Sequence, residues 1–483
     1  MSESVEVTTS LERELTEQRR WRLRPRYART KIFDRLLRNE FLSADEQRAN
    51  ESRALARILR FAAAEVPYYR ELFSAHGLSP RDIASADDLP KLPLLDKDLV
   101  RQNDARLRPA HLPPGEQAFG IFSTSGTTGQ PTKVHHTANS NAMFTYLAQR
   151  QYRWCRFDPG KTAAFVRTPR DLPRTPEGGL YPDGETCRLQ NWRYVGQIFE
   201  TGPWIGLTMS TPVERQIEWL RAHRPAYLCT HASWLEHLCF ATGGEVLAES
   251  LESVLAIVED LRPSARRFVE RSLGVPVHQN YGMNEVGLMA MRCTAGRYHV
   301  HTEHCLIEIL DPDGQPCAPG TSGRIAVTAL RNPAMPLIRY DTDDMAEAVD
   351  GPCPCGRSLP SFGELTGRYR RYICLPEGSY PLFRAVRGAI NELPSDTIRA
   401  MRQFQMHQYR DGRFELRVAA TGPLPLAFHE AVRAAWDAAL GGRSETFEVI
   451  EVDEIPRGPN GKFQDFTSDY MPPPDGGPTG TDA

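Results

Sequence analysis

The chain has 483 residues, more than a single hydrophobic core normally supports, so at least two domains are expected. Its 58 Lys+Arg and 61 Asp+Glu residues leave a formal net charge of -3 with no long basic block, which argues against a nucleic-acid partner. No apolar run is long enough to span a bilayer, and the N-terminal 30 residues lack the apolar stretch of a secretory signal. We therefore expect a soluble, cytoplasmic protein that binds neither nucleic acid nor membrane.

The N-terminal three quarters of the chain predict an α/β domain. Residues 11–77 are rich in helix formers with apolar side chains at helical spacing, interrupted at Pro67. Strand-like and helix-like segments then alternate, as in YLCTH from Tyr227 and RRFVERSL from Arg266, which favours layered α/β sheets. Between Ile307 and Thr328, an Asp-Gly turn and short β-branched runs predict a small β subdomain.

The C-terminal part predicts a small, mobile α+β domain. The segments FELRVAA, LAFHEAVRAAWDAAL and TFEVIEV are typical of a strand, a helix and a strand. We place the domain boundary near 365–372. The predicted organisation is an N-terminal domain over 1–367, a C-terminal domain over 368–470 and a disordered Pro- and Gly-rich tail over 471–483.

The segment STSGTTGQPTK, residues 123–133, is the sharpest local signal. Its glycines let the backbone approach a ligand closely, its hydroxyls add hydrogen-bond donors, and Lys133 supplies a point charge, so it suits phosphate. Pro131 and Thr132 separate the last glycine from the lysine, which excludes a P-loop. A flexible surface linker is the alternative interpretation.

Other ordered segments extend this signal into a family resemblance. TSGTTGxPxK resembles the phosphate loop of the adenylate-forming superfamily of acyl- and aryl-CoA synthetases, adenylation domains and luciferases. The chain also has NYGMNEVG, IRYDTDD, the Gly-Arg of LTGRYRRY and IPRGPNGKF, in the family's order. Two family positions differ, because Asn284 replaces a threonine and Asp343 a glycine. CPCGR at Cys353 is similar to the phenylacetate-CoA ligase branch, and the resemblance covers about Arg53 to Phe466.

The resemblance implies adenylation of a carboxylic acid with ATP and Mg²⁺, release of pyrophosphate, and transfer of the acyl group to CoA. It implies that Glu285 holds magnesium, that Lys462 bridges the acid and the α-phosphate, and that Thr128 also takes part in catalysis. Asp344 would accept hydrogen bonds from the ribose hydroxyls, with Arg368 beside it. The implied nucleotide-binding residues are Ser123, Thr124, Ser125, Gly126, Thr127, Thr128, Gly129, Lys133, Asn280, Tyr281, Gly282, Asp344 and Arg368. Taken singly, Asp344 and Lys462 could equally be surface turn residues.

A second group of residues predicts a structural zinc site. Three thiolates and one imidazole, from Cys293, His299, Cys353 and Cys355, suit tetrahedral zinc. His301 or His304 could replace His299 as the ligand. The alternative is that the cysteines are reduced and packed in a core, since ten cysteines without an export signal are not expected to form disulfides.

The acid pocket and the acceptor are less defined. The resemblance makes His231, Trp234, His278 and Asn280 candidates to line a pocket for an aryl acid, although each could be an ordinary core residue. Arg370 and Arg371 stand where the phenylacetate ligase branch has acids, so an amine, a carrier-protein thiol or nitrite could replace CoA.

The rival function classes are a silent nucleotide-binding protein and an acyltransferase with a nucleophile among Cys155, Cys187 and Cys229. The partners expected are a small carboxylic acid and ATP. The sequence leaves a homodimer and a carrier-protein partner open.

Overall fold

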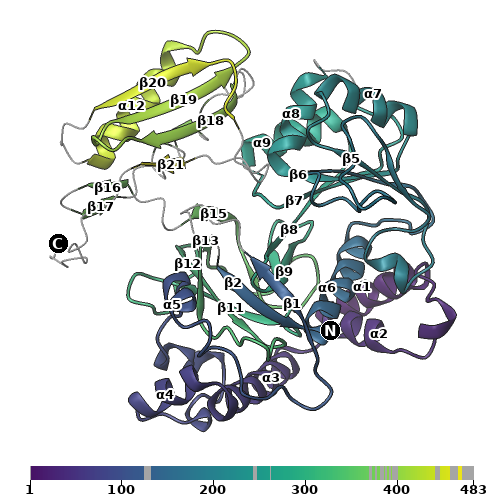
Figure 1. Cartoon of the computed structure of the whole chain (residues 1–483), viewed down its shortest axis with the longest axis vertical. Coiled ribbons are helices and arrows are strands. Elements are labelled where there is room, and N and C mark those ends of the chain that lie inside the picture. The colour runs from purple at the N-terminus through teal and green to yellow at the C-terminus, as the bar shows by residue number, and fades with distance from the viewer. Residues whose placement is uncertain are drawn as a thin grey trace.

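The structure is a computed structural model in which residues 2–123, 132–242, 247–261, 263–368, 373–375, 378–380, 386, 389–390, 393, 401–440, 446–456 and 466–469 are described. Its architecture, in layers of helices and sheets, is of the predicted α/β class (Figure 1). The described α-helices are α1 (Ser2–Arg19), α2 (Ile32–Asn39), α3 (Ala44–Glu65), α4 (Pro67–Ala75), α5 (Lys97–Gln102), α6 (Ala138–Trp154), α7 (Val213–His223), α8 (Ala232–Ala241), α9 (Pro263–Leu273) and α12 (Leu426–Leu440). No described helix combines the length and the apolar character that crossing a membrane requires.

Nine of the described strands form one large sheet, in the order β14-β10-β9-β8-β7-β6-β3-β5-β4. Adjacent strands from β8 to β5 in this order are parallel, whereas β4, β9, β10 and β14 run antiparallel to their neighbours. The strand bounds are β3 (Ala163–Arg167), β4 (Cys187–Leu189), β5 (Trp204–Thr208), β6 (Tyr227–His231), β7 (Ser253–Ile257), β8 (Val277–Met283), β9 (Gly287–Arg292), β10 (Tyr298–Val300) and β14 (Ser361–Phe362).

The parallel strands are buried on both faces, which is why they read as apolar runs rather than as alternating ones. On one face, side chains of α7, α8 and α9 join Leu228, Val254 and Leu207 in a shared core. On the other face, α6 contributes Leu147 and Tyr152 to an aromatic core that includes other strands. The sheet is therefore a central layer covered by helices on both faces.

The smaller sheets follow the predicted pattern. The strands β11 (Cys305–Leu310), β12 (Ser322–Ala329), β13 (Tyr340–Glu347) and β15 (Leu365–Arg368) form an antiparallel sheet where the β subdomain was expected. The C-terminal strands β18 (Met401–Gln408), β19 (Phe414–Ala420), β20 (Phe447–Val452) and β21 (Phe466–Ser468) form a sheet whose core includes Phe428 and Trp436 of α12. Two hairpins complete the described strands, β1 (Ala118–Ser123) with β2 (Lys133–Thr137) and β16 (Ile373–Leu375) with β17 (Gly378–Tyr380).

The helices of the N-terminal region pack on two different parts of the molecule. Helix α3 ends at Glu65 and α4 begins at Pro67, because the residue before a proline favours extended backbone, as Val66 does here. Helices α3 and α4 pack into the core of the β subdomain, and α1 and α2 lie beside α6 (Figure 1).

A buried ion network fixes α1 and α2 against α6. Arg153, on α6, pairs with Glu14 of α1 and with Glu40 at the end of α2, and all three side chains are almost fully buried. Arg357 reaches the same two carboxylates, at 2.9 Å from Glu14 and 3.2 Å from Glu40. Buried charges are tolerated only when paired, so this network holds four separate segments in one arrangement.

Candidate functional site

The two ends of the predicted phosphate loop are held together by a hairpin. Ser123, the last residue of β1, lies opposite Lys133, the first residue of β2, in an antiparallel register. The Asn284 side-chain amide donates to the Ser123 carbonyl at 3.0 Å, which ties the hairpin to the segment after β8. The predicted residues between these ends, together with Lys462, lie outside the described residues; they are Thr124, Ser125, Gly126, Thr127, Thr128 and Gly129.

Tyr281 joins the large sheet to the β subdomain. It lies on β8, and its hydroxyl donates to the Asp344 carboxylate at 3.0 Å and lies 3.3 Å from the Thr342 hydroxyl on β13. Asp344 pairs in turn with Arg368 of β15 in the backbone register. The structure therefore brings together three residues predicted to bind the nucleotide, although Tyr281 and Asp344 are 63 residues apart in the sequence.

Glu285 lies at the same junction and is 4% exposed. The Tyr340 hydroxyl donates to its Oε1 at 3.1 Å. Burial raises the pKa of the Glu285 carboxyl, although Lys97 and the Tyr340 hydrogen bond act in the opposite direction. A carboxylate deprived of water in this way would be stabilised by a divalent cation, so the residue fits the magnesium role that the family resemblance implies.

Two positions of this region are glycine in the family motifs; one is kept here as Gly282, and the other is Asp343. A Cβ on Gly282 would lie 2.6 Å from the Gly287 carbonyl oxygen, so only glycine fits there. Asp343 stands where the family motif has glycine, and its φ of 64° lies in the left-handed region. Aspartate is among the few other residues that adopt this conformation, and Lys97 pairs with it at 2.8 Å. The departure from the motif thus keeps the backbone conformation.

Three of the four residues predicted to line the acid pocket lie on one face of the large sheet. His231 ends β6 and pairs with Ile257 in the parallel register, and His278 and Asn280 lie on β8 beyond it. The Asn280 amide donates to Gln151 of α6 at 2.8 Å, which identifies the face as the one that α6 covers. Burial lowers the pKa of His278 to about 4, so this imidazole is neutral near pH 7.

Trp234 is not brought to that group. It lies on α8, packs against the core on the opposite face of the sheet, and its indole N–H donates to Gln216 of α7 at 2.8 Å. Its position fits a role in packing α7 against α8 better than a role in the acid pocket.

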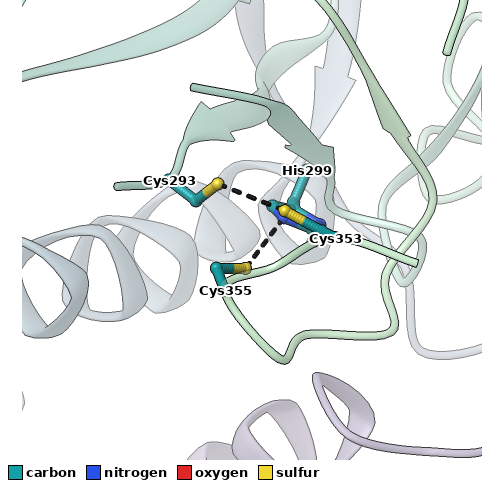
Figure 2. A group of neighbouring side chains, drawn as sticks. All are labelled: Cys293, His299, Cys353 and Cys355. Atoms are coloured by element: carbon teal, nitrogen blue, oxygen red, sulfur yellow. Dashed lines mark hydrogen bonds between the residues drawn. The ribbon is translucent and has the colours of Figure 1, made fainter. Parts of the chain in front are cut away.

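The four residues predicted to bind zinc form a cluster. The ligand atoms of Cys293, His299, Cys353 and Cys355 all lie within 4.8 Å of one another, and Figure 2 shows their side chains pointing toward a common centre. Cys293 and Cys353 have their sulfurs 3.6 Å apart, and the Cys355 sulfur is 3.2 Å from His299 Nε2. A disulfide would require about 2.05 Å between sulfurs. Ligands at about 2.3 Å from a tetrahedral zinc would lie about 3.8 Å apart, so the spacing fits a shared metal.

The imidazole and the thiols are prepared for such a role. His299 Nδ1 lies 2.9 Å from the Leu359 carbonyl, which leaves Nε2 to face the sulfurs. Hydrogen bonds among the thiols lower the pKa of Cys293 and raise that of Cys353, so Cys293 gives up its proton first within the group. The two alternative imidazoles are engaged elsewhere, since His301 faces Arg150 and His304 contacts the Val286 carbonyl.

Sequence reasoning missed several residues of this region. Lys97 lies in a proline-rich stretch without a motif, and Gln151 lies in the last turn of α6, so neither carried a local signal. Tyr340 was recognised as a family landmark, but its bond to Glu285 depends on a contact between residues 55 positions apart.

Comparisons with known proteins give a consistent result. The chain is 28% identical to phenylacetate-coenzyme A ligase of Thermus thermophilus over 343 residues, 68% of this chain and 72% of the relative. It is 29% identical to the Escherichia coli enzyme of that name over 339 residues, with the same coverage, and 25% identical to that of Pseudomonas putida over 387 residues, 78% of this chain and 82% of the relative. No family model matches the chain.

Solved structures show the same fold at lower identity. The chain matches a 2-hydroxyisobutyryl-CoA ligase in complex with its acyl-AMP with a TM-score of 0.68 at 19% identity, over 89% of this chain and 91% of the other. An anthranilate CoA ligase in complex with anthranoyl-AMP matches with a TM-score of 0.50 at 13% identity, over 86% of this chain and 79% of the other. The chain is thus similar in sequence to phenylacetate-CoA ligases and shares the fold of acyl-CoA ligases solved with an acyl-AMP.

Proposed function

We propose that this protein is an AMP-forming acid–thiol ligase that activates an aryl acid as its adenylate and transfers the acyl group to CoA. The observation that carries the proposal is the junction at Tyr281, Glu285 and Asp344, where residues of the large sheet and the β subdomain are joined by hydrogen bonds. Ser123, at one end of the Ser123 to Lys133 loop, accepts a hydrogen bond from Asn284, the residue before Glu285. A site assembled from three separate segments is more specific than any one of its motifs.

The residues have distinct tasks in this proposal. Asp344 offers two oxygens to the ribose hydroxyls. The Tyr281 hydroxyl fixes the orientation of this carboxylate by donating a hydrogen bond to Oδ2. Glu285 would hold Mg²⁺, which when bound neutralises charge on the departing pyrophosphate. The acid enters as a carboxylate that is already ionised, so the attack on the α-phosphorus needs no general base. Lys462 is proposed to place its charge between the two reactants, as in the family.

An aryl acid is the substrate class that the α6 face of the sheet suits best. On this face Phe144 contacts Tyr194 edge to face at 5.0 Å, and Tyr194 lies near Tyr152 of α6. Aromatic walls with a few polar groups are typical of pockets for small ring compounds. We also propose that Cys293, His299, Cys353 and Cys355 bind one structural zinc ion, because all four positions of a tetrahedron are filled by protein atoms.

The structure disfavours a cysteine nucleophile at the three positions considered. Cys155, Cys187 and Cys229 are buried, and burial raises the pKa of each thiol, to about 12 for Cys229. A thiolate, which is the nucleophilic form, is therefore scarce near pH 7. The acyltransferase alternative thus lacks an activated group at these positions.

The test is pyrophosphate release by the full-length protein with ATP, Mg²⁺ and a panel of aryl acids, followed by chromatography for the CoA thioester. We expect release that depends on the acid, and a thioester only when CoA is added. Lys462→Ala should reduce release by at least about a hundredfold, as loss of an electrostatic catalytic group does. Lys161→Ala, at an exposed lysine paired with Glu252, is the matched control. Absence of acid-dependent release would refute the proposal, and release without thioester would redirect it to another acceptor.

A further inference from the structure

The chain adds parallel strands to the large sheet first on one side of β3 and then on the other side. From β3 the chain continues to β5 on one side, and then crosses to β6 on the other side of β3 before it proceeds to β7 and β8. In open parallel sheets, ligands bind in the crevice that such a reversal opens at the carboxyl ends of the strands. The last residues of the two strands concerned are Arg167 of β3 and His231 of β6, which directly follow the paired residues Val166 and Thr230.

Arg167 is held in a fixed orientation at this edge. Its Nη2 lies 3.0 Å from Oδ2 of Asp171, in the turn that follows β3. The Thr168 hydroxyl donates to the same carboxylate oxygen at 2.8 Å, and Arg193 donates to the Asp171 backbone carbonyl. The turn therefore serves as a support for the guanidinium, which has little freedom to move away.

One donor of this guanidinium is buried without an acceptor. The Nε atom of Arg167 has no hydrogen-bond partner among the described residues, although the side chain also hydrogen-bonds the Cys229 thiol. A buried polar group left in this state costs about 1–3 kcal/mol, so native proteins seldom keep one without a use. Arg167 is 18% exposed whereas Asp171 is 42% exposed, so the pair lies at the boundary between the sheet and an accessible space.

The charges at this position select the kind of group that would bind. Burial would raise the pKa of Asp171, but Arg167 and the Thr168 hydroxyl outweigh it and hold the pKa below its usual value. Arg167 and Asp171 thus form a neutral ion pair. A second carboxylate on the substrate would face the Asp171 carboxylate and be repelled, whereas a hydroxyl or amino group can accept from the guanidinium and donate to the carboxylate.

The distance from the activated carboxylate is also suitable. Strands β3 and β8 are separated by β6 and β7, so their axes lie about 14 Å apart at about 4.8 Å per strand. Tyr281, which contacts Asp344, lies on β8. An acid that extends along the carboxyl edge from the Tyr281 and Asp344 junction would bring its ring substituent toward Arg167, whose guanidinium stays beside Asp171 at the end of β3.

We infer that Arg167, oriented by Asp171, is a specificity-determining residue that binds a hydroxyl or amino substituent on the ring of the acid. The inference rests on the proposed adenylation of an aryl acid and defines which aryl acids the site prefers. Arg167 contacts the distal end of the substrate and takes no part in the bond-making step.

The experiment compares unsubstituted, hydroxy-, amino- and carboxy-substituted phenylacetates as substrates for pyrophosphate release. We expect the native protein to prefer a hydroxy or amino acid over the unsubstituted one. Arg167→Met, which keeps the length and removes the donors, should lower kcat/KM for the preferred acid by at least about tenfold, mainly through KM. Its kcat/KM for the unsubstituted acid should stay within about twofold. Asp171→Asn should weaken the preference in the same direction, and Arg188→Met, an exposed arginine beside His223, should change neither value.

Three results would overturn the inference. These are no preference among the substituted acids, an equal loss for every acid in Arg167→Met, or a preference for the carboxy-substituted acid that the variant abolishes. Calorimetric binding of the same acids gives an answer that does not depend on turnover. A hydroxy acid that binds the native protein at least about tenfold more tightly than Arg167→Met supports the subsite, and equal binding overturns it. If that binding difference is present while no acid releases pyrophosphate, only the proposed function fails.

Discussion

Removal of the zinc ion that we propose for the Cys293 cluster should destabilise the protein by an amount that the structure allows us to work out. Cys293 and Cys353 are 60 residues apart in the sequence, with sulfurs 3.6 Å from each other, so a shared zinc ion would close a loop of that length. For a cross-link closing 60 residues, the chain-entropy relation gives about 4 kcal/mol of stabilisation.

That free energy converts to a measurable shift in Tm. At about 2.1 cal/mol/K per residue, a cooperative unit of about 370 residues unfolds with an entropy of about 0.8 kcal/mol/K. A loss of about 4 kcal/mol should therefore lower Tm by about 5 °C. The effect should also reach α1, because Arg357, two residues after Cys355, pairs with Glu14 at 2.9 Å. Exchange of amide hydrogens in α1 should accordingly accelerate when the metal is removed.

The assay is metal analysis of the purified protein together with thermal unfolding before and after chelation. We expect about one zinc per chain. Cys353→Ser should lose the metal and match the chelated protein in Tm, while Cys317→Ser, at a cysteine outside the cluster, should keep both. Folded protein without zinc, or a fall in Tm of less than about 1 °C on removing bound zinc, would refute the reasoning.

Three other substitutions test the junction and the buried ion network. Tyr281→Phe removes the 3.0 Å hydrogen bond to Asp344 and should raise KM for ATP about tenfold with a smaller change in kcat; an unchanged KM would contradict the role of Tyr281. Glu285→Gln should abolish the Mg²⁺-dependent reaction. Because the folded pKa of Glu285 is raised, its ionisation costs stability as pH rises above 4.5, so this variant should melt higher than the native protein at pH 8, with the gap closing toward pH 4.5. A Tm difference independent of pH would contradict this. Glu40→Gln removes a fully buried carboxylate shared by Arg153 and Arg357 and should cost about 3–5 kcal/mol by denaturant unfolding, whereas a cost below about 1 kcal/mol would mean that water reaches the network.

The sequence predicted those parts of the fold that depend on local pattern. The α/β class, the β subdomain after Ile307 and the break at Pro67 all follow from periodicity, turn residues and the restriction before proline, which act over a few positions. The Cys293 cluster could be predicted from the sequence because three cysteines and a histidine in combination are typical of a metal site.

What the sequence could not supply were contacts between distant segments. The ion network of Glu14, Glu40 and Arg153 consists of common residue types on ordinary helices, and its members became partners only when α1, α2 and α6 packed together. Trp234 shows that residues close together in the sequence can also end up far from a common site. It follows β6 directly, yet the turn into α8 carries it to the opposite face of the sheet from His231.

Asp343 shows how a departure from a motif can alter chemistry while keeping the backbone. The left-handed conformation costs an ordinary residue about 1–2 kcal/mol, and the 2.8 Å ion pair with Lys97 offsets part of that cost. Asp343→Gly removes both terms, so we expect its stability to change by less than about 1 kcal/mol. Lys97 would then keep a charge without its partner and lower the pKa of Glu285 further, because it already acts in that direction. The acid limb of the pH profile for kcat/KM of ATP should therefore move to lower pH. Asp343→Asn, which also tolerates the left-handed conformation, should move it equally; a shift in the glycine variant alone would assign the effect to the backbone rather than to the charge.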